Sequence, residues 1–152
     1  MTLNDEEKHQ KRMQIKKAMI DEKVAKATEE RGVLIVLSGP GKGKSSSGFG
    51  TIIRAIGHGY KTAIVQFIKG TWDCGERNFI QQRCPEVPFI VMGSGFTWET
   101  QNKEQDREAA QQAWQQTKVL LQDESIHLVL LDELTYILKY GYIDAEEVYQ
   151  AL

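Results

Sequence analysis

The sequence has few of the features that mark extracellular, membrane-spanning or strongly charged proteins. Only two of its 152 residues are cysteines, only three are prolines, and the formal net charge is −2. Cys74 and Cys84 form no CxxC pair and have no nearby histidine, so we expect free thiols rather than a metal site. No apolar run approaches the roughly 18 residues of a membrane span, and the amino-terminal end is charged, unlike a secretory signal. We therefore expect a cytoplasmic protein that binds neither nucleic acid nor membrane.

Residues 1–31 differ from the rest of the chain. They contain no glycine or proline and are rich in Lys, Glu, Gln and Ala. Asn4 followed by Glu7 is typical of a helix start with a capping box. One narrow apolar stripe at helical spacing consists of Met13, Ile20, Val24 and Ala27. Two interpretations stay open: a solvated helix with a weak docking face, or an arm that folds over a site of its own chain or of a partner.

From Gly32 onward, short apolar runs alternate with segments of helical periodicity, and the length suits one domain. Four runs predict strands, at residues 33–37, 62–68, 88–92 and 126–131. The first is an unbroken β-branched and aliphatic run, as expected for a strand buried on both faces. Strands alternating with helices predict an α/β fold with a parallel sheet and right-handed crossovers.

Three helices are predicted between and after these strands. The first has Phe49, Ile52, Ile53 and Ile56 on one face and ends around Gly57 and Gly59, with His58 as a capping residue. The second, over residues 103–121 with Asn102 as its cap, turns inward Ala110, Ala113, Trp114, Thr117 and Leu121. The third opens at Asp144. Because the chain ends at Leu152 within an apolar-periodic helix, we expect the carboxyl-terminal part of the domain to be missing.

The turn after the first predicted strand has the pattern of a phosphate-binding loop. Residues 38–46 have the sequence SGPGKGKSS, close to the usual G-x-x-x-x-G-K-[ST]. Backbone N–H groups of such a loop surround phosphate, and its glycines permit positive φ. Lys44 would supply a charge, Ser45 a hydroxyl to Mg²⁺, and the following helix its positive end, whereas Pro40 removes one N–H donor. The residues predicted to bind the triphosphate are Ser38, Gly39, Gly41, Lys42, Gly43, Lys44 and Ser45.

The fourth predicted strand ends in two acids, Asp132 and Glu133, which is the pattern of a Walker-B segment. Carboxylates at this position hold Mg²⁺ directly or through water. Together with the loop they predict binding of ATP with Mg²⁺ or Mn²⁺. The predicted fold is a P-loop NTPase (RecA-like) domain over residues 32–152, a parallel sheet flanked by helices, preceded by the charged helical arm of residues 1–31.

Aromatic residues stand in the loops that leave the carboxyl ends of the strands, where open parallel sheets bind ligands. The loop predicted after the second strand covers residues 69–78 and contains Trp72, and the loop predicted after the third covers residues 93–100 and contains Phe96 and Trp98, all amid glycines. Such side chains over a phosphate site indicate a flat, apolar co-substrate. The alternative is that they cover the core from the loop side.

At these loops the sequence resembles the ATP:corrinoid adenosyltransferases of the CobA/BtuR family. The resemblance covers nearly the whole chain and rests on SGPGKGKSS at 38–46, VQFIKGTWDCGERN at 65–78, GFTWETQN at 95–102 and LDELTY at 131–136. Two departures are Pro40, where the family usually has Asn, and Ser45-Ser46 in place of the usual Thr-Thr. The hydroxyls survive the second change.

The resemblance implies transfer of the 5′-deoxyadenosyl group of ATP to Co(I) of a reduced corrinoid, cob(I)alamin or cobinamide, with release of triphosphate. It also implies a homodimer, a flavoprotein electron donor and a reversed orientation of ATP in the loop. Triphosphate and Mg²⁺ would be held by Lys44, Ser45 and Ser46, with Asp132 and Glu133 on the metal side. Phe96 and Trp98 would pack against the lower face of the corrin and displace the axial base from cobalt. The residues implied to act in catalysis are Lys44, Glu133, Phe96 and Trp98.

Two other functions fit part of the pattern. A P-loop ATPase or kinase would use Glu133 to activate water or an acceptor hydroxyl, but it leaves the GFTWET loop without a role. A nucleotide-dependent binding module would deliver a corrinoid without forming a cobalt–carbon bond.

Overall fold

The computed structural model describes residues 4–68, 73–93 and 103–152 of the chain. The chain divides into two compact units, Met1–Ile35 and Val36–Leu152. The first unit contains helix α1 (Asp5–Lys26), in which no residue is buried. Its predicted capping box is confirmed: the Asn4 side chain accepts a hydrogen bond from the Glu7 N–H at 2.9 Å, and the Glu7 carboxylate accepts one from the Asn4 N–H at 3.1 Å. The predicted apolar stripe is therefore exposed within its own helix.

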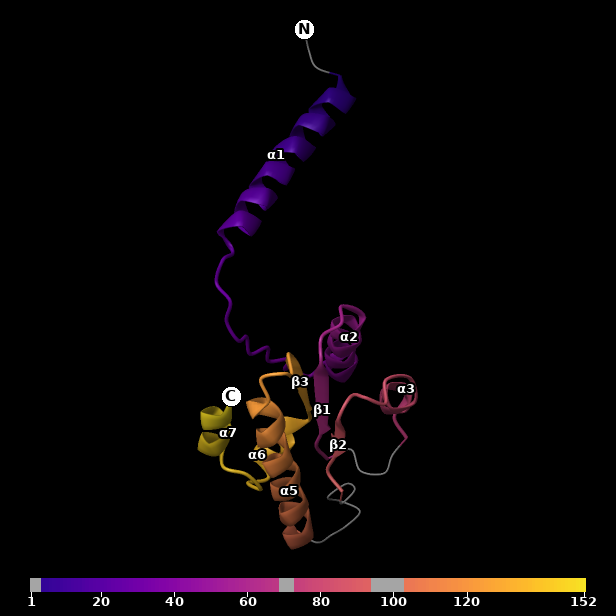
Figure 1. The fold of residues 1–152 in the computed structure, drawn as a ribbon, viewed down its shortest axis with the longest axis vertical. Helices are drawn as coiled ribbons and strands as arrows, with labels where there is room; N and C mark the ends of the chain where they lie inside the picture. The colour runs from indigo at the N-terminus through magenta and orange to yellow at the C-terminus, as the bar shows by residue number, and fades with distance from the viewer. Residues whose placement is uncertain (1–3, 69–72, 94–102) are drawn as a thin grey trace. The chain divides into compact units, whose positions relative to one another are not determined.

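The second unit is built on a three-stranded parallel sheet (Figure 1). The strands are β1 (Thr62–Gln66), β2 (Phe89–Val91) and β3 (Leu128–Asp132), in the order β2-β1-β3. The register places Gln66, the last residue of the central strand, opposite Val91 on one side and Asp132 on the other. The parallel sheet was predicted from the alternation of strands and helices, and this prediction is confirmed.

The predicted first strand is not formed. Residues 33–37 belong to no strand, and their side chains are 47–73% exposed. A β-branched run forms a strand only where a neighbouring strand satisfies its backbone N–H and C=O groups. The sequence shows the preference of the run but not whether such a neighbour exists. The prediction of a strand over residues 33–37, buried on both faces, is therefore wrong.

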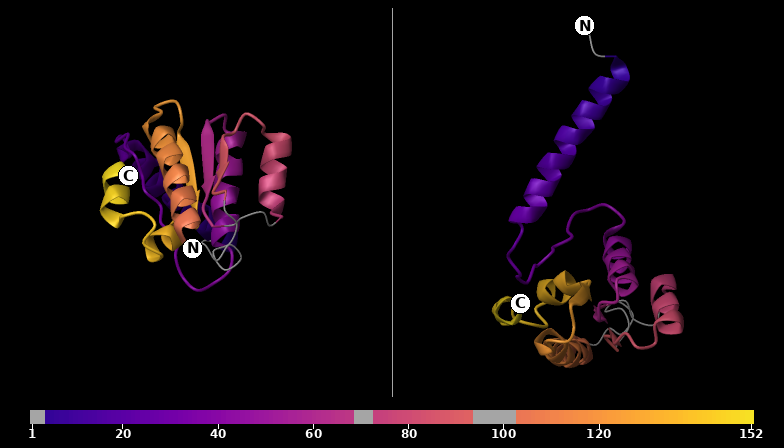
Figure 2. Two further views of the ribbon diagram at one scale, coloured as in Figure 1. Left: turned by 90° about the horizontal axis from the view of Figure 1, so that it is seen from below. Right: turned by 45° about the horizontal axis from the view of Figure 1, so that its top comes forward.

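Helices cover both faces of the sheet (Figure 2). On one face, α2 (Lys44–Gly57) and α3 (Gly75–Arg83) meet the side of β1 that carries Ile64; the buried residues of this cluster are Phe49, Ile52, Ile64, Ile80 and Val87. On the other face, α5 (Lys103–Gln122), α6 (Leu134–Lys139) and α7 (Ala145–Ala151) meet the side that carries Val65 and Phe67. Successive residues of β1 thus serve opposite layers, as the alternation of a strand requires.

Most of the helix predictions are confirmed. His58 is the C-cap of α2, and the Asp144 side chain caps α7 by accepting a hydrogen bond from the Glu146 N–H at 2.8 Å. Of the residues expected to face inward, those buried are Phe49, Ile52, Ala110, Ala113, Trp114 and Thr117, and those partly buried are Ile56 and Leu121. Ile53 is 44% exposed, so its predicted inward position is wrong. The predicted cap Asn102 lies outside the described residues.

The helix after the glycine-rich loop approaches β3 closely at Gly48. A Cβ atom on Gly48 would lie 2.8 Å from Leu130 Cδ1, closer than side-chain carbons normally pack. The absence of a side chain therefore allows α2 to lie against the strand that ends at Asp132. Among the described helices, none is both long enough and apolar enough to cross a membrane.

Candidate functional site

The glycine-rich loop leads directly into α2, as the phosphate-loop pattern predicts. Gly39 and Gly43 have φ values of +126° and +100°, in the range that side chains disfavour, and Gly43 is the N-cap of α2. The Lys44 ammonium donates hydrogen bonds to the main-chain carbonyls of Gly39, at 2.7 Å, and of Gly41. The Lys44 side chain therefore lies back across the loop, where a bound phosphate would need a positive charge. Ser38 and Lys42 are exposed members of the same loop.

The loop and the acidic end of β3 are in contact, although they are 87 residues apart in the sequence. Ser45 Oγ donates a hydrogen bond to Asp132 Oδ1 at 2.9 Å. Asp132 is 7% exposed, and a buried carboxylate requires such donors. Glu133 follows as the N-cap of α6 with a φ of +63°, a conformation that is uncommon for a residue other than glycine. The structure thus brings together the hydroxyl and the carboxylate predicted to lie on the metal side.

Two polar residues that were not predicted as site residues also contact this region. Gln66, fully buried at the end of β1, donates from Nε2 to Asp132 Oδ2 at 3.0 Å. Glu76, in the first turn of α3, accepts from Ser46 Oγ at 3.5 Å and from Cys74 Sγ at 3.4 Å. Gln66 is a polar amide at the end of an otherwise mostly apolar strand, TAIVQ. This is a signal in the sequence from which a role for Gln66 could have been predicted. An acid near a helix start is common, so Glu76 gives no comparable signal.

The sequence predicts a loop over residues 69–78, between β1 and β2. Helix α3 begins at Gly75, so residues 75–78 are helical and the prediction is wrong for them. The shift matters because the helix brings Glu76 to Ser46. The predicted aromatic residues Trp72, Phe96 and Trp98 lie outside the described residues. Their roles stay predictions.

The oxygen donors at this point fit a magnesium ion. Over residues 4–68, 73–93 and 103–152, no group of three or more His, Cys, Asp or Glu side chains could enclose a metal. Mg²⁺ does not require such a group, because it usually keeps several waters and takes one or two carboxylates plus phosphate oxygens. The adjacent Ser45 hydroxyl and Asp132 carboxylate match that donor set. Glu133, the next residue, is half-buried.

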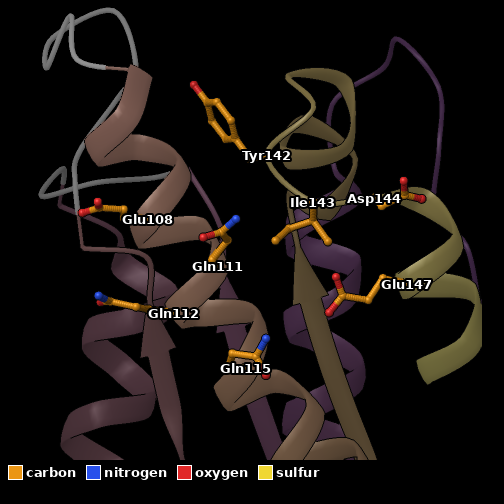
Figure 3. A pocket seen from close by; sticks show the side chains of 8 residues that line it. All are labelled: Glu108, Gln111, Gln112, Gln115, Tyr142, Ile143, Asp144 and Glu147. Atoms are coloured by element: carbon orange, nitrogen blue, oxygen red, sulfur yellow. The ribbon is translucent and has the colours of Figure 1, made fainter.

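A separate polar cavity of about 530 Å³ lies between α5 and the segment that leads into α7 (Figure 3). Its lining residues are Glu108, Gln111, Gln112, Gln115, Tyr142, Ile143, Asp144 and Glu147. None of them belongs to the glycine-rich loop or to the acidic end of β3. The cavity is therefore not part of the predicted phosphate site.

Charged contacts beside this cavity fix α7 against α5. The Glu147 carboxylate oxygen Oε1 accepts hydrogen bonds from Lys118 Nζ at 2.8 Å and from Trp114 Nε1 at 3.0 Å. The Lys118 hydrogen bond, its charge and the Trp114 hydrogen bond together hold the pKa of Glu147 below its ordinary value. Burial raises the pKa of Tyr142, and the nearby Asp106 carboxylate adds to this effect. Both pKa shifts arise where α7 and the segment before it pack against α5, and not at the glycine-rich loop.

The comparison with known families agrees with the geometry of the loop and the acidic strand end. The family described as ATP:corrinoid adenosyltransferase BtuR/CobO/CobP matches residues 30–152. The chain belongs to this family. The resemblance inferred from the sequence motifs is thereby confirmed, and the match leaves out α1.

Similar proteins of known name support the same assignment. The chain is 52% identical to the corrinoid adenosyltransferase of Escherichia coli strain K12, over 97% of this chain and 74% of that protein. It is 51% identical to the corrinoid adenosyltransferase of Pseudomonas aeruginosa, over 94% of this chain and 70% of that protein. It is 50% identical to the corrinoid adenosyltransferase CobA of Salmonella typhimurium, over 97% of this chain and 74% of that protein.

Proposed function

We propose that this chain is an ATP:corrinoid adenosyltransferase that transfers the 5′-deoxyadenosyl group of ATP to Co(I) of a reduced corrinoid in cobalamin biosynthesis or salvage. The observation that carries the proposal is the family match over residues 30–152, with about 50% identity to relatives named corrinoid adenosyltransferases. The hydrogen bond between Ser45 and Asp132 supports a nucleotide site of the P-loop type. The left-handed glycines of the loop and the parallel sheet support a P-loop NTPase fold of the RecA-like kind.

The loop and its neighbours would hold the triphosphate end of ATP. Main-chain N–H groups around Gly41 and Gly43 surround the phosphates, Lys44 adds a positive charge, and Ser46 adds a second hydroxyl. Ser45, Asp132 and Glu133 would hold Mg²⁺, which neutralises negative charge on the phosphates when bound. These groups fix the position of the triphosphate and so orient the 5′ carbon at its other end.

The reaction needs no general base. The electron pair of Co(I) forms the cobalt–carbon bond at C5′, the C5′–O bond breaks, and its electron pair leaves with the triphosphate. No proton is transferred in this step, so what the site must do is position the carbon and stabilise charge on the leaving group. Lys44 lies at the loop that would stabilise this charge.

The aromatic residues Trp72, Phe96 and Trp98 would form the corrinoid side of the site. An axial donor raises the energy of the cobalt orbital that must accept an electron, so a dry aromatic face that displaces the donor favours reduction to Co(I). A homodimer, a flavoprotein electron donor and a cytoplasmic location complete the proposal and rest on the sequence. The two free cysteines, Cys74 and Cys84, agree with a reducing compartment.

Incubation with ATP, Mg²⁺ and chemically reduced cobalamin tests this function. We expect a light-sensitive alkylcobalamin in the absorption spectrum and intact triphosphate among the products. The variant Lys44→Ala should lose the product, whereas Lys61→Ala, an exposed lysine beside the opposite end of β1, should not. Release of phosphate or ADP without the alkyl product would favour the ATPase or kinase and contradict the proposal.

A further inference from the structure

The geometry assigns Gln66 as a positioning residue for the nucleotide site: its side-chain amide orients the Asp132 carboxylate toward Ser45 and the metal side. This inference rests on the proposed function, because it takes Asp132 to be the carboxylate that binds Mg²⁺. It adds a residue on the central strand that the loop and acidic-strand motifs do not contain.

The contacts hold both oxygens of the carboxylate from different elements. Ser45 Oγ, from α2, donates to Oδ1 at 2.9 Å, and Gln66 Nε2, from β1, donates to Oδ2 at 3.0 Å. The sheet register places Gln66 directly beside Asp132, and the Phe67 N–H donates to the Asp132 carbonyl at 2.9 Å. The two donors therefore fix the plane of the Asp132 carboxylate, because a quarter-turn about its last torsion would break both hydrogen bonds.

The orientation of the amide follows from its neighbour. A carboxylate oxygen only accepts hydrogen bonds, so the NH₂ end of Gln66 must face Asp132. The amide oxygen Oε1 is then buried, and no partner for it is present in the described part of the chain. A buried acceptor of this kind costs stability. Because an apolar side chain of the same size would avoid that cost, the contact with Asp132 is a better explanation for glutamine here than core packing.

Thr62 provides a matched comparison on the same strand. It is buried at the other end of β1, four residues from Gln66, and points to the same face. Its Oγ1 is also buried and, among the described residues, has no hydrogen-bond partner. The register pairs Thr62 with Leu128, four residues from Asp132. Replacing Thr62 perturbs the same strand without touching Asp132.

The test measures the binding of ATP by calorimetry, first in EDTA and then at increasing Mg²⁺ concentration. Removing the partner of a metal-binding carboxylate typically lowers metal affinity by about 10- to 100-fold. Methionine keeps the volume of Gln66 but donates no hydrogen bond. We expect Gln66→Met to raise, by about tenfold or more, the Mg²⁺ concentration at which half of the Mg²⁺-dependent increase in ATP affinity is reached. The affinity for ATP in EDTA should stay within about twofold of the wild type, because the loop amides and Lys44 are unchanged. Thr62→Val should follow the wild type in both conditions.

Several results would decide against the inference. A folded Gln66→Met or Gln66→Leu with the wild-type Mg²⁺ midpoint would overturn it. Failure of both variants to fold, while Thr62→Val folds, would give Gln66 a purely structural role and overturn it as well. Lack of any Mg²⁺ effect on the wild-type protein would instead contradict the proposed metal site, so the two failures can be distinguished.

Discussion

At the level of single residues, Ser45 and Asp132 show how a hydroxyl can serve two purposes. The Ser45 hydroxyl donates its one proton to Asp132 Oδ1, and a hydroxyl oxygen is also a type of atom that can coordinate a cation. The second donor to the same carboxylate, Gln66, comes from the central strand. A carboxylate held in this way loses little rotational freedom when it binds a metal, because the sheet and α2 have already fixed it.

The aromatic residues Phe96 and Trp98 give a prediction at the same scale. We expect Phe96→Ala and Trp98→Ala to leave ATP binding within about twofold of the wild type, since neither belongs to the phosphate loop. Truncating an aromatic side chain that anchors a ligand costs on the order of 2 kcal/mol. This corresponds to a loss of roughly 30-fold in the adenosylation of Co(II) corrinoid in the presence of a reductant. The measurement is the rate of alkylcobalamin formation, beside calorimetry of ATP.

A matched control is Phe79→Ala, because Phe79 is a 48% exposed aromatic on α3 and is not among the residues assigned to the corrinoid. It should keep the wild-type rate. Wild-type rates in both Phe96→Ala and Trp98→Ala would show that the role assigned to the GFTWET segment is wrong.

At the level of elements, the contact between α2 and β3 sets the distance from the loop to the acidic strand end. Gly48 faces Leu130, where an added Cβ would lie 2.8 Å from Cδ1, whereas a Cβ on Gly50 would meet no atom of the described residues within 4 Å beyond its own helix and neighbours. Gly50→Ala should therefore stabilise the protein by about 0.5–1 kcal/mol through helix propensity alone. Gly48→Ala gains the same helix propensity, but the added methyl group must displace the Leu130 side chain. The Gly48→Ala protein should therefore be less stable than the Gly50→Ala protein by about 1–3 kcal/mol.

Urea unfolding of the two variants measures this difference. Gly48→Ala should also weaken the effect of Mg²⁺ on ATP binding, because a shift of α2 moves Ser45 relative to Asp132. Equal stabilisation by the two substitutions would mean that α2 does not need the close approach at Gly48.

The packing of α7 against α5 gives a prediction on pH. The pKa of Glu147 lies below its ordinary value of 4.5, chiefly because Lys118 donates a hydrogen bond to it. A group whose folded-state pKa is lowered adds stability above its unfolded pKa and loses that contribution as the pH falls through the folded value. Glu147→Gln should thus be less stable than the wild type at pH 7, and the difference should disappear at a pH below the folded pKa.

Urea unfolding between pH 3 and pH 7 checks this dependence. Glu146→Gln removes the adjacent, exposed carboxylate and controls for the change of net charge. A stability difference for Glu147→Gln that stays constant down to pH 3 would mean that the contact with Lys118 does not depend on the charge of Glu147.

At the level of the whole molecule, the features predicted correctly are those that neighbours in the sequence determine. The capping box at Asn4 and the Asp144 cap depend only on residues two or three positions away. The amphipathic pattern of α5 needs only a core on one side. The contact between Ser45 and Asp132 joins two predicted motifs, but the roles of these residues in binding nucleotide and metal stay predictions.

The features that were missed depend on distant partners. Whether residues 33–37 form a strand depends on an adjacent strand, which the run itself cannot reveal. The contact of Gln66 with Asp132 depends on the sheet register that places the two residues side by side. Glu76 contacts Ser46 only because a helix, rather than a loop, begins at Gly75.

The division of the chain into an arm and a domain gives the last prediction. Helix α1 has no buried residue, and the family match begins at residue 30. A chain of residues 30–152 should therefore unfold within about 2 °C of the full chain, which corresponds to less than about 1 kcal/mol for a protein of this size. Adenosylation kinetics of the full chain and of residues 30–152 distinguish the two interpretations of the amino-terminal arm. A solvated helix predicts unchanged kinetics, whereas an arm that covers a site predicts a raised KM for corrinoid at an unchanged melting temperature. A fall in melting temperature of more than about 5 °C would show that the arm contributes to the core and that the predicted domain boundary near residue 31 is wrong.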